Sequence, residues 1–405
     1  MLEPWLAPCG FLSLRNYNSM SEKIFIVSGG TGGHIIPARC LAAHLAAEKR
    51  DVFFFGDEKI NNYRRAEDGF TTSVIGASQL KKSLPFLAKA ALKISFGILQ
   101  SLYFLLRFKP KYVVAFGGYA TFPMLVAACL TKTKIILHEQ NSHLGKVNRI
   151  FAKFADKIAL SFPSTSGIAA QDLLKTIFTG NPVRAEIAAL NNLSYQLPLQ
   201  EKNEPNLGNR LGYNVLLASD FSQEPKRPNL FKILVIGGSG GAKIFSEILP
   251  KSFFNLSEHV KEKIQVIQQC RAELVQETFD QYRLFNINIV TDSFFDNMSE
   301  LLRDAHLVIA RAGSSSIVEF CAAKKPMILI PFAAAADNHQ EKNAHYLKEN
   351  DAAIIVKESE FTINAVNELL KNLIEDEVRL KELSDNAGSL AVLDATQNLA
   401  RLLND

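Results

Sequence analysis

The chain has 405 residues, of which 47% are apolar and 21% are charged. This length favours two domains, and the composition is typical of a globular protein with a large core, not of a disordered chain. The five cysteines form no CxxC pair and no Cys/His cluster, which argues against a disulfide scaffold and against a structural zinc site.

Residues 1–22 are expected to be an N-terminal extension. They are mildly apolar but interrupted by Pro4, Pro8 and Gly10, and they lack the basic start and continuous apolar run of a secretory signal. Met20 stands just before the first clear strand, so Met1 and Met20 are both candidate starts.

The first half opens with a predicted strand at 23–27, a glycine-rich turn at 29–33 and a helix at 35–49. Continuous apolar strands followed by helices indicate a parallel sheet that is covered on both faces. Further buried strands are predicted at 52–55, 112–116 and 135–137.

The most apolar segment of the chain is 84–108. Its longest uncharged run, 94–106, covers about 20 Å as a helix, which is shorter than the ~30 Å hydrocarbon core of a bilayer. The segment is therefore either a buried core helix or a helix that lies at a membrane surface. In the second case the contacting residues would be Phe96, Leu99, Tyr103, Lys89 and Lys93.

Charge is distributed unevenly along the chain. Residues 1–230 contain 27 basic and 16 acidic residues, whereas 231–405 contain 18 and 25. No acidic residue occurs between Asp68 and Glu139, although nine basic residues do. A face of this kind is attracted to anionic surfaces, which keeps the interfacial interpretation of 84–108 open.

The second half repeats the layout of the first, with a strand at 231–236 and a glycine-rich turn at 237–241. The preceding stretch is rich in Asn, Gln, Ser and Pro and is interpreted as a linker or insertion at 191–230. The predicted fold is therefore α/β, with two Rossmann-like doubly wound parallel-sheet domains at 23–190 and 231–405. The other strands of the second domain are predicted at 264–268, 287–290, 306–309 and 327–330.

Both glycine-rich turns are candidate phosphate sites, because glycines let backbone N–H groups at a helix start approach an anion closely. Neither turn fits the dinucleotide fingerprint, since Ile35 and Lys243 replace its last glycine, and neither fits the P-loop pattern. Each turn alone is as consistent with an empty turn as with a phosphate site. Their matching positions strengthen the second interpretation.

Polar residues follow several of the predicted strands, at the edge where open α/β sheets bind ligands. His34 is either a helix-capping histidine or a general base. His138 to Asn141 form either a generic polar turn or part of the same site. Ser314 to Ser316 either cap a helix or supply donors to a diphosphate, with Glu319 one turn later.

Eight stretches, taken together and in order, resemble the bacterial N-acetylglucosaminyltransferases that complete the lipid-linked peptidoglycan precursor. The stretches are GGTGGHIIPA, FGGYATFP, HEQNSHLGKVNR, TGNPVR, IGGSGGAK, FFDNM, RAGSSSIVE and DNHQEKNA. The sequence departs from the family pattern at Gly240, where a glutamine is usual, at Thr121, where a serine is usual, and at His339, where the first of two glutamines is usual.

The resemblance implies a GT-B architecture with the active cleft between an acceptor- and membrane-facing first domain and a UDP-sugar-binding second domain. It implies inverting transfer of N-acetylglucosamine from UDP-N-acetylglucosamine to the 4-hydroxyl of undecaprenyl-pyrophosphate-linked N-acetylmuramoyl-pentapeptide, in cell-wall biogenesis. His34 or Glu139 would be the base. The substrate-binding residues would be Thr31, Gly32, Gly33, Asn141, Arg184, Ser239, Phe295, Ser314, Ser315, Ser316, Ile317, Val318, Glu319 and Gln340.

The same resemblance places the protein peripherally at the cytoplasmic face of the inner membrane, on anionic lipid, and implies no cofactor, no metal and no nucleic-acid partner. Two other functions fit the residues. A nucleotide-sugar epimerase shares the two-domain fold and needs no lipid, and a membrane-recruited UDP-sugar-binding module would dispense with His34 and Glu139.

Overall fold

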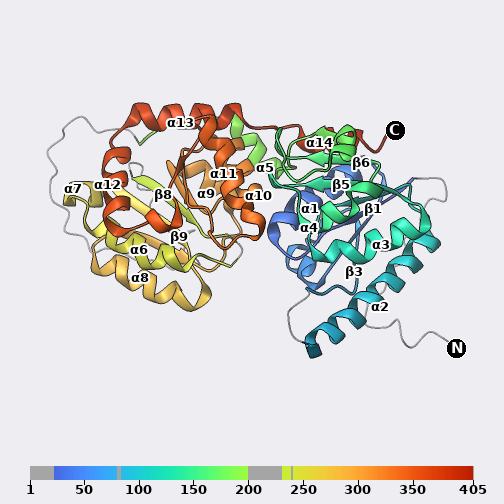
Figure 1. Ribbon diagram of the computed structural model, residues 1–405. Coiled ribbons are helices and arrows are strands. Elements are labelled where there is room, and N and C mark those ends of the chain that lie inside the picture. Colours follow the sequence, from blue (N-terminus) through green and yellow to red (C-terminus); the bar gives the residue numbers. More distant parts are fainter. Residues whose placement is uncertain (1–21, 80–83, 199–229, 239, 405) are drawn as a thin grey trace. The chain divides into compact units, whose positions relative to one another are not determined.

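The computed structural model describes residues 22–79, 84–198, 230–238 and 240–404. They divide into two compact units, of which the first contains the described residues up to Ala185 together with those from Val392, and the second is Glu186–Ala391. Each unit is a parallel sheet with helices on both faces (Figure 1). The expected fold of two doubly wound α/β domains is confirmed.

The first sheet has seven strands in the order β3-β2-β1-β4-β5-β6-β7, all parallel. The order reverses between β1 and β4, and this switch point is where open α/β sheets bind ligands. The sequence pattern predicts β1, β2, β4 and β5 and misses the other three. The strands are β1 Lys23–Val27, β2 Asp51–Gly56, β3 Thr71–Val74, β4 Tyr112–Ala115, β5 Lys134–Glu139, β6 Lys157–Leu160 and β7 Thr176–Phe178.

Alternate residues of β1 enter two separate cores, as the period of a strand requires. Ile24 and Ile26 pack in the core that contains α1 and α14, whereas Phe25 and Val27 pack in the core that contains α2 and α3. The α-helices of this unit are α1 Gly32–Ala47, α2 Leu84–Phe108, α3 Phe122–Thr131, α4 Lys146–Phe151, α5 Ala185–Ala188 (shared with the second unit) and α14 Ala395–Arg401.

The C-terminal segment belongs to the first unit, whereas the sequence pattern assigns all of 231–405 to the second domain. The cause is apolar burial, because Leu399 and Leu403 are each 1% exposed in the core on the α1 side of the first sheet. Gly180 marks the same contact. Its φ is +77°, and a Cβ there would lie 2.6 Å from Val392 Cγ1.

Helix α2 lies beside α3 and packs against the first unit by one face only (Figure 1). Gly97 on that face is so close to the chain at Gly76 that a Cβ would lie 1.8 Å from the Gly76 carbonyl oxygen. The opposite face exposes an apolar row that we call the α2 stripe. It consists of Leu92, Phe96, Leu99, Tyr103 and Leu106, which are 51–74% exposed.

Among the described residues, one helix segment, Phe86–Phe108, is long and apolar enough to cross a membrane by length and composition alone. Only 22% of its most apolar window is buried, so α2 is not an ordinary core helix. The Gly97 contact shows that its other face is covered by protein.

The second sheet has six parallel strands in the order β10-β9-β8-β11-β12-β13, again with a switch point, here between β8 and β11. The strands are β8 Phe231–Ile236, β9 Ile264–Gln269, β10 Asn288–Asp292, β11 Leu307–Ala310, β12 Met327–Leu329 and β13 Ile354–Ile355. The α-helices that follow α5 are α6 Lys243–Phe254, α7 Glu258–Lys263, α8 Val275–Leu284, α9 Met298–Asp304, α10 Ser314–Ala322, α11 His339–Glu349, α12 Ile363–Ile374 and α13 Glu377–Ser389.

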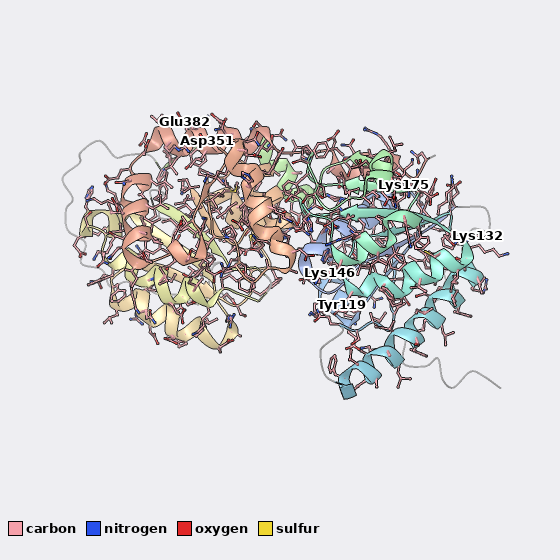
Figure 2. The ribbon with its side chains drawn as sticks, viewed as in Figure 1. Tyr119, Lys132, Lys146, Lys175, Asp351 and Glu382 are labelled. Atoms are coloured by element: carbon pink, nitrogen blue, oxygen red, sulfur yellow. The ribbon has the colours of Figure 1, made fainter. Side chains whose placement is uncertain are left out.

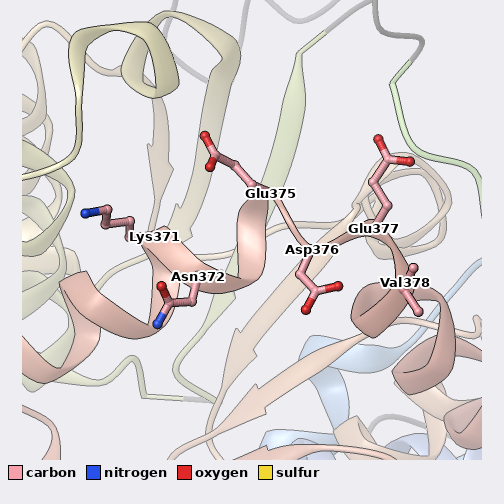
Figure 3. A pocket seen from close by; sticks show the side chains of 6 residues that line it. All are labelled: Lys371, Asn372, Glu375, Asp376, Glu377 and Val378. Carbon is pink, nitrogen blue, oxygen red and sulfur yellow. The ribbon is translucent and has the colours of Figure 1, made fainter.

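The start of helix α13 is held by Arg379, which pairs with Asp351 and Glu382, both labelled in Figure 2. Arg379 donates to both oxygens of Asp351 at 2.6 Å and to Glu382 at 3.2 Å. A hollow lies where α12 meets α13 (Figure 3) and has three carboxylates on its lining, Glu375, Asp376 and Glu377. This lining would repel a diphosphate, so we assign the hollow no part in the site.

His306, which precedes β11, makes the stability of the second unit depend on pH. Its Nδ1 accepts from the backbone N–H of Lys232 at 2.9 Å. Burial, with a smaller contribution from Lys325 and Lys232, lowers the pKa of His306 from 6.5 to about 4. The unfolded chain therefore takes up the proton first, and stability is lost as the pH falls from about 6.5 towards 4.

We expect the unfolding free energy of His306→Asn, which keeps an acceptor for Lys232, to depend less on pH. Between pH 7 and pH 5 the wild-type protein should lose about 2 kcal/mol more unfolding free energy than the variant. Urea titrations at the two pH values measure the difference, with His345→Asn on an exposed site as the control. Equal pH slopes for wild type and His306→Asn would contradict the assignment.

Candidate active site

The switch point of the first sheet is formed by the turns that follow β1 and β4. Gly30, Gly117 and Gly118 have φ values of +85°, +73° and +78°, which favour glycine. At Gly29 a Cβ would lie 2.5 Å from the Cβ of Ala120, so the two turns approach each other too closely for a side chain. Together they form a backbone-lined edge directly before α1.

Asp57, directly after β2, supports the first glycine turn. Its carboxylate accepts from the Gly30 N–H at 3.3 Å and from the hydroxyl of Tyr119, which Figure 2 labels, while Lys59 Nζ donates to the Gly30 carbonyl at 2.8 Å. Burial and the Asp57 carboxylate raise the pKa of Tyr119, so its hydroxyl stays protonated as a donor. Asp57 is not among the residues predicted from the sequence, although its position directly after a buried strand is a usable signal.

His34, in the first turn of α1, contacts the polar residues that follow β5. Its Nδ1 lies 2.7 Å from Gln140 Oε1, and Gln140 Nε2 lies 2.9 Å from His138 Nδ1. His138 Nε2 lies 3.2 Å from the carbonyl oxygen of Gly180. Burial lowers the pKa of His138 to about 4, so this second imidazole is neutral.

Glu139 is 1% exposed and its carboxylate is fully engaged by the loop that follows it. One oxygen accepts from the N–H and the side-chain amide of Asn141 at 3.0 and 3.1 Å. The other accepts from Gly145 N at 2.8 Å and from Asn148 Nδ2 at 2.9 Å. These four hydrogen bonds fix the loop and the start of α4 around the carboxylate.

The switch point of the second sheet lies between the glycine turn after β8 and the start of α10. Gly241 has a φ of +67°, and a Cβ there would lie 2.7 Å from the Arg271 nitrogen. Ser239, a predicted donor contact, lies outside the described residues. Helix α10 begins at Ser314 with no acidic residue in its first turn, and Ser314 and Glu319 are 6% and 7% exposed.

Arg311 holds the chain that follows β12. Its Nη1 donates to the Ile330 carbonyl at 3.2 Å and to Glu358 at 2.9 Å, and its guanidinium lies over the ring of Phe332. Gln340 Oε1 accepts from the Phe332 N–H at 2.9 Å, so this predicted sugar contact also closes the loop. Arg311 and Glu358 are site-organising residues that sequence reasoning did not assign.

The predicted residues thus form two groups, one in each unit. Thr31 to His34, Glu139 and Asn141 come together at the first switch point, and Arg184 is half-buried after β7. Ser314 to Glu319, Phe295 and Gln340 follow strands of the second sheet. Within the described parts of the chain no group of three His, Cys, Asp or Glu residues is arranged to hold a metal ion.

Two parallel sheets of this kind, each with a glycine turn at its switch point, are typical of the GT-B fold. The N-terminal domain model of glycosyltransferase family 28 matches residues 24–160, and the C-terminal domain model of that family matches 232–399. The chain belongs to this family and, within it, to the UDP-N-acetylglucosamine–N-acetylmuramyl-(pentapeptide) pyrophosphoryl-undecaprenol N-acetylglucosamine transferases.

Relatives of that name support the assignment over nearly the whole chain. The protein from Rhodospirillum centenum is 33% identical over 93% of this chain and 92% of its own length. That from Caulobacter vibrioides is 31% identical over 95% and 99%.

Solved structures share the fold. MurG of Acinetobacter baumannii has a TM-score of 0.68 at 23% identity and covers 95% of this chain and 99% of its own. The UDP-GlcNAc 2-epimerase of Neisseria meningitidis has a TM-score of 0.62 at 14% identity and covers 95% and 100%. The fold alone therefore does not separate a transferase from an epimerase.

Proposed function

We propose that the protein transfers N-acetylglucosamine from UDP-N-acetylglucosamine to the 4-hydroxyl of lipid-linked N-acetylmuramoyl-pentapeptide, with inversion at the anomeric carbon. The observation that carries the proposal is the match at 31–33% identity to transferases of this name across more than 90% of both chains. The positions of His34 and of the α10 start support it, because a histidine base and a helix start for a diphosphate would suit this reaction.

Most of the residues assigned to the donor belong to the second unit. Ser314 to Ser316 begin α10, where the helix dipole and backbone N–H groups favour a diphosphate. Glu319, one turn later and nearly buried, would accept from the ribose hydroxyls, and the uracil would lie against the chain at Phe295. Gln340, Asn141, Arg184 and the glycine turn at Thr31 would contact the sugar and its diphosphate.

The proposed base is His34 and not Glu139. The four donors to Glu139 come from the loop that follows it and from Asn148 on α4, which gives that carboxylate a structural role. His34 uses only Nδ1 in the contact with Gln140. Its Nε2 would take the proton of the 4-hydroxyl while that oxygen forms a bond to the anomeric carbon, and the breaking bond leaves its electron pair on UDP.

The proposed membrane contact is the α2 stripe, and the proposed location is the cytoplasmic face of the inner membrane. Phe96, Leu99 and Tyr103 are 51%, 65% and 53% exposed on α2. Lys89 and Lys93 are exposed on the same helix, and Lys132, labelled in Figure 2, ends the neighbouring α3. An apolar row with nearby cations suits an anionic lipid surface, where the long acceptor chain is embedded.

We expect the triple variant Phe96→Ser, Leu99→Ser and Tyr103→Ser to bind vesicles containing anionic lipid at least tenfold more weakly. Each lost apolar side chain contributes roughly 1.5–3 kcal/mol when fully buried, so even partial insertion produces this loss. Sedimentation with vesicles measures it. The matched control replaces three exposed leucines elsewhere, Leu173, Leu174 and Leu284. Equal binding by both triple variants would contradict the proposal.

The transfer of labelled N-acetylglucosamine from UDP-N-acetylglucosamine to a short-chain lipid-linked muramoyl-pentapeptide tests the proposed function. We expect label in the lipid product and equimolar release of UDP. Conversion of the donor to an epimer or to free sugar would establish the epimerase alternative. Donor binding without any transfer would establish the binding-module alternative.

A further inference from the structure

Behind His34 a chain of three hydrogen bonds ends on a backbone carbonyl. The Gly180 oxygen can only accept, so His138 must carry its proton on Nε2, which lies 3.2 Å away. His138 Nδ1 is then an acceptor, and the Gln140 amide nitrogen donates to it at 2.9 Å. The amide oxygen of Gln140 therefore faces His34 and requires a proton on His34 Nδ1.

A second hydrogen bond fixes the same orientation of the Gln140 amide. Its Nε2 also lies 3.1 Å from the carbonyl oxygen of His138, and this oxygen accepts only from a donor. A flipped amide would place two oxygens face to face there and would leave two acceptors opposed at His138 Nδ1. Both contacts select the same arrangement.

The chain of hydrogen bonds behind His34 lies in the protein interior. His138 is fully buried and Gln140 is 1% exposed, and the ring of Phe116 lies 4.8 Å from the His138 ring. The C-terminal segment packs closely on Gly180, where a Cβ would lie 2.6 Å from Val392. His138 stays neutral near neutral pH. The hydrogen bonds therefore hold the proton on His34 Nδ1 in place and do not relay it.

We propose that Gln140, backed by His138 and the Gly180 carbonyl, is a positioning residue that holds His34 in the tautomer with hydrogen on Nδ1 and a lone pair on Nε2. This inference rests on the proposed role of His34 as the base. A histidine that accepts a proton at Nε2 must present that nitrogen unprotonated, and the alternative tautomer is inactive. Gln140 Oε1 then keeps its hydrogen bond to the imidazolium that forms.

Two variants of Gln140 separate positioning from a structural role. Gln140→Leu removes the acceptor, and we expect kcat to fall by about 10- to 10³-fold, since a wrong tautomer costs up to about 10⁴-fold in another histidine enzyme. KM for UDP-N-acetylglucosamine should stay near the wild-type value. Gln140→Glu keeps an oxygen for His34 and, with a proton on the oxygen that faces His138, should recover part of kcat.

Partial recovery by Gln140→Glu separates the two roles, because a protonated glutamate has the hydrogen-bonding groups of glutamine, whereas leucine has only a similar shape. A kcat of Gln140→Leu close to wild type, or a Gln140→Glu enzyme as slow as Gln140→Leu, would overturn the proposal.

Nitrogen-15 NMR of histidine-labelled protein gives a readout that does not need activity. The His34 signals, identified by their loss in His34→Gln, should show a protonated Nδ1 and an unprotonated Nε2 in the wild type and a changed pattern in Gln140→Leu. Gln276→Leu, at an exposed glutamine of α8, is the control. A wild-type His34 protonated on Nε2 would overturn the inference, whereas full turnover by His34→Ala would instead overturn the assigned base.

Discussion

Replacement of His34 by alanine should reduce kcat by about 10²- to 10⁴-fold, the usual contribution of a general base. The affinity for UDP-N-acetylglucosamine should stay close to wild type, because His34 is not assigned to the donor and the residues assigned to the uracil and the ribose belong to the second unit. Initial rates in the transfer assay and calorimetric titration with the donor measure the two quantities separately.

The matched control is His44→Ala, on the same helix α1 but paired with Glu48 outside the switch point. It should leave kcat unchanged. Glu139→Gln gives a second contrast, because an amide nitrogen would oppose two of the four donors and destabilise the loop by about 1–3 kcal/mol. A His34→Ala enzyme that turns over normally, beside an inactive but folded Glu139→Gln enzyme, would reverse the assignment of the base.

Gly97→Ala should lower the unfolding free energy of the protein by about 1–3 kcal/mol or more, the usual cost of overpacking. The new Cβ would lie 1.8 Å from the Gly76 carbonyl oxygen and 2.7 Å from its carbon. Both partners are backbone, so no side chain can move aside, and α2 must shift away from the unit. Helix propensity would favour alanine, so a loss of stability can come only from this contact.

Urea unfolding of Gly97→Ala beside Ser95→Ala, an exposed position on α2, measures this effect. We expect the control to unfold within about 0.5 kcal/mol of wild type, as surface substitutions usually do. If Gly97→Ala were as stable as the control, α2 would not be packed through its glycine face, and the account of the α2 stripe would lose its basis.

The fold could be predicted from the sequence because buried parallel strands leave continuous apolar runs, as in 23–27 and 231–236. Two of the missed strands, β7 and β3, lack this signal. β7 has two exposed residues among its three, and β3 reads Thr-Thr-Ser-Val. The sequence also could not predict that α14 packs in the first unit, because the pattern of an amphipathic helix does not show which of two cores it joins.

The candidate site could be predicted in part. Open α/β sheets bind ligands beyond the carboxyl ends of their strands, and this rule predicted His34 and the serines of α10. The same rule could have predicted Asp57, which directly follows β2. It could not choose between His34 and Glu139, since that choice depends on the four donors that surround the carboxylate. The role of Gln140 depends on hydrogen bonds to residues 106 positions before it and two positions before it, which no local pattern encodes.

The configuration of the transferred sugar tests the central claim most directly. After incubation with UDP-N-acetylglucosamine and the short-chain acceptor, the disaccharide product is isolated and its anomeric coupling is measured by proton NMR. A single displacement with His34 as base predicts one product, β-linked to the 4-oxygen of the muramoyl residue. An α-linked product, or an epimerised sugar with no link to the acceptor, would contradict it.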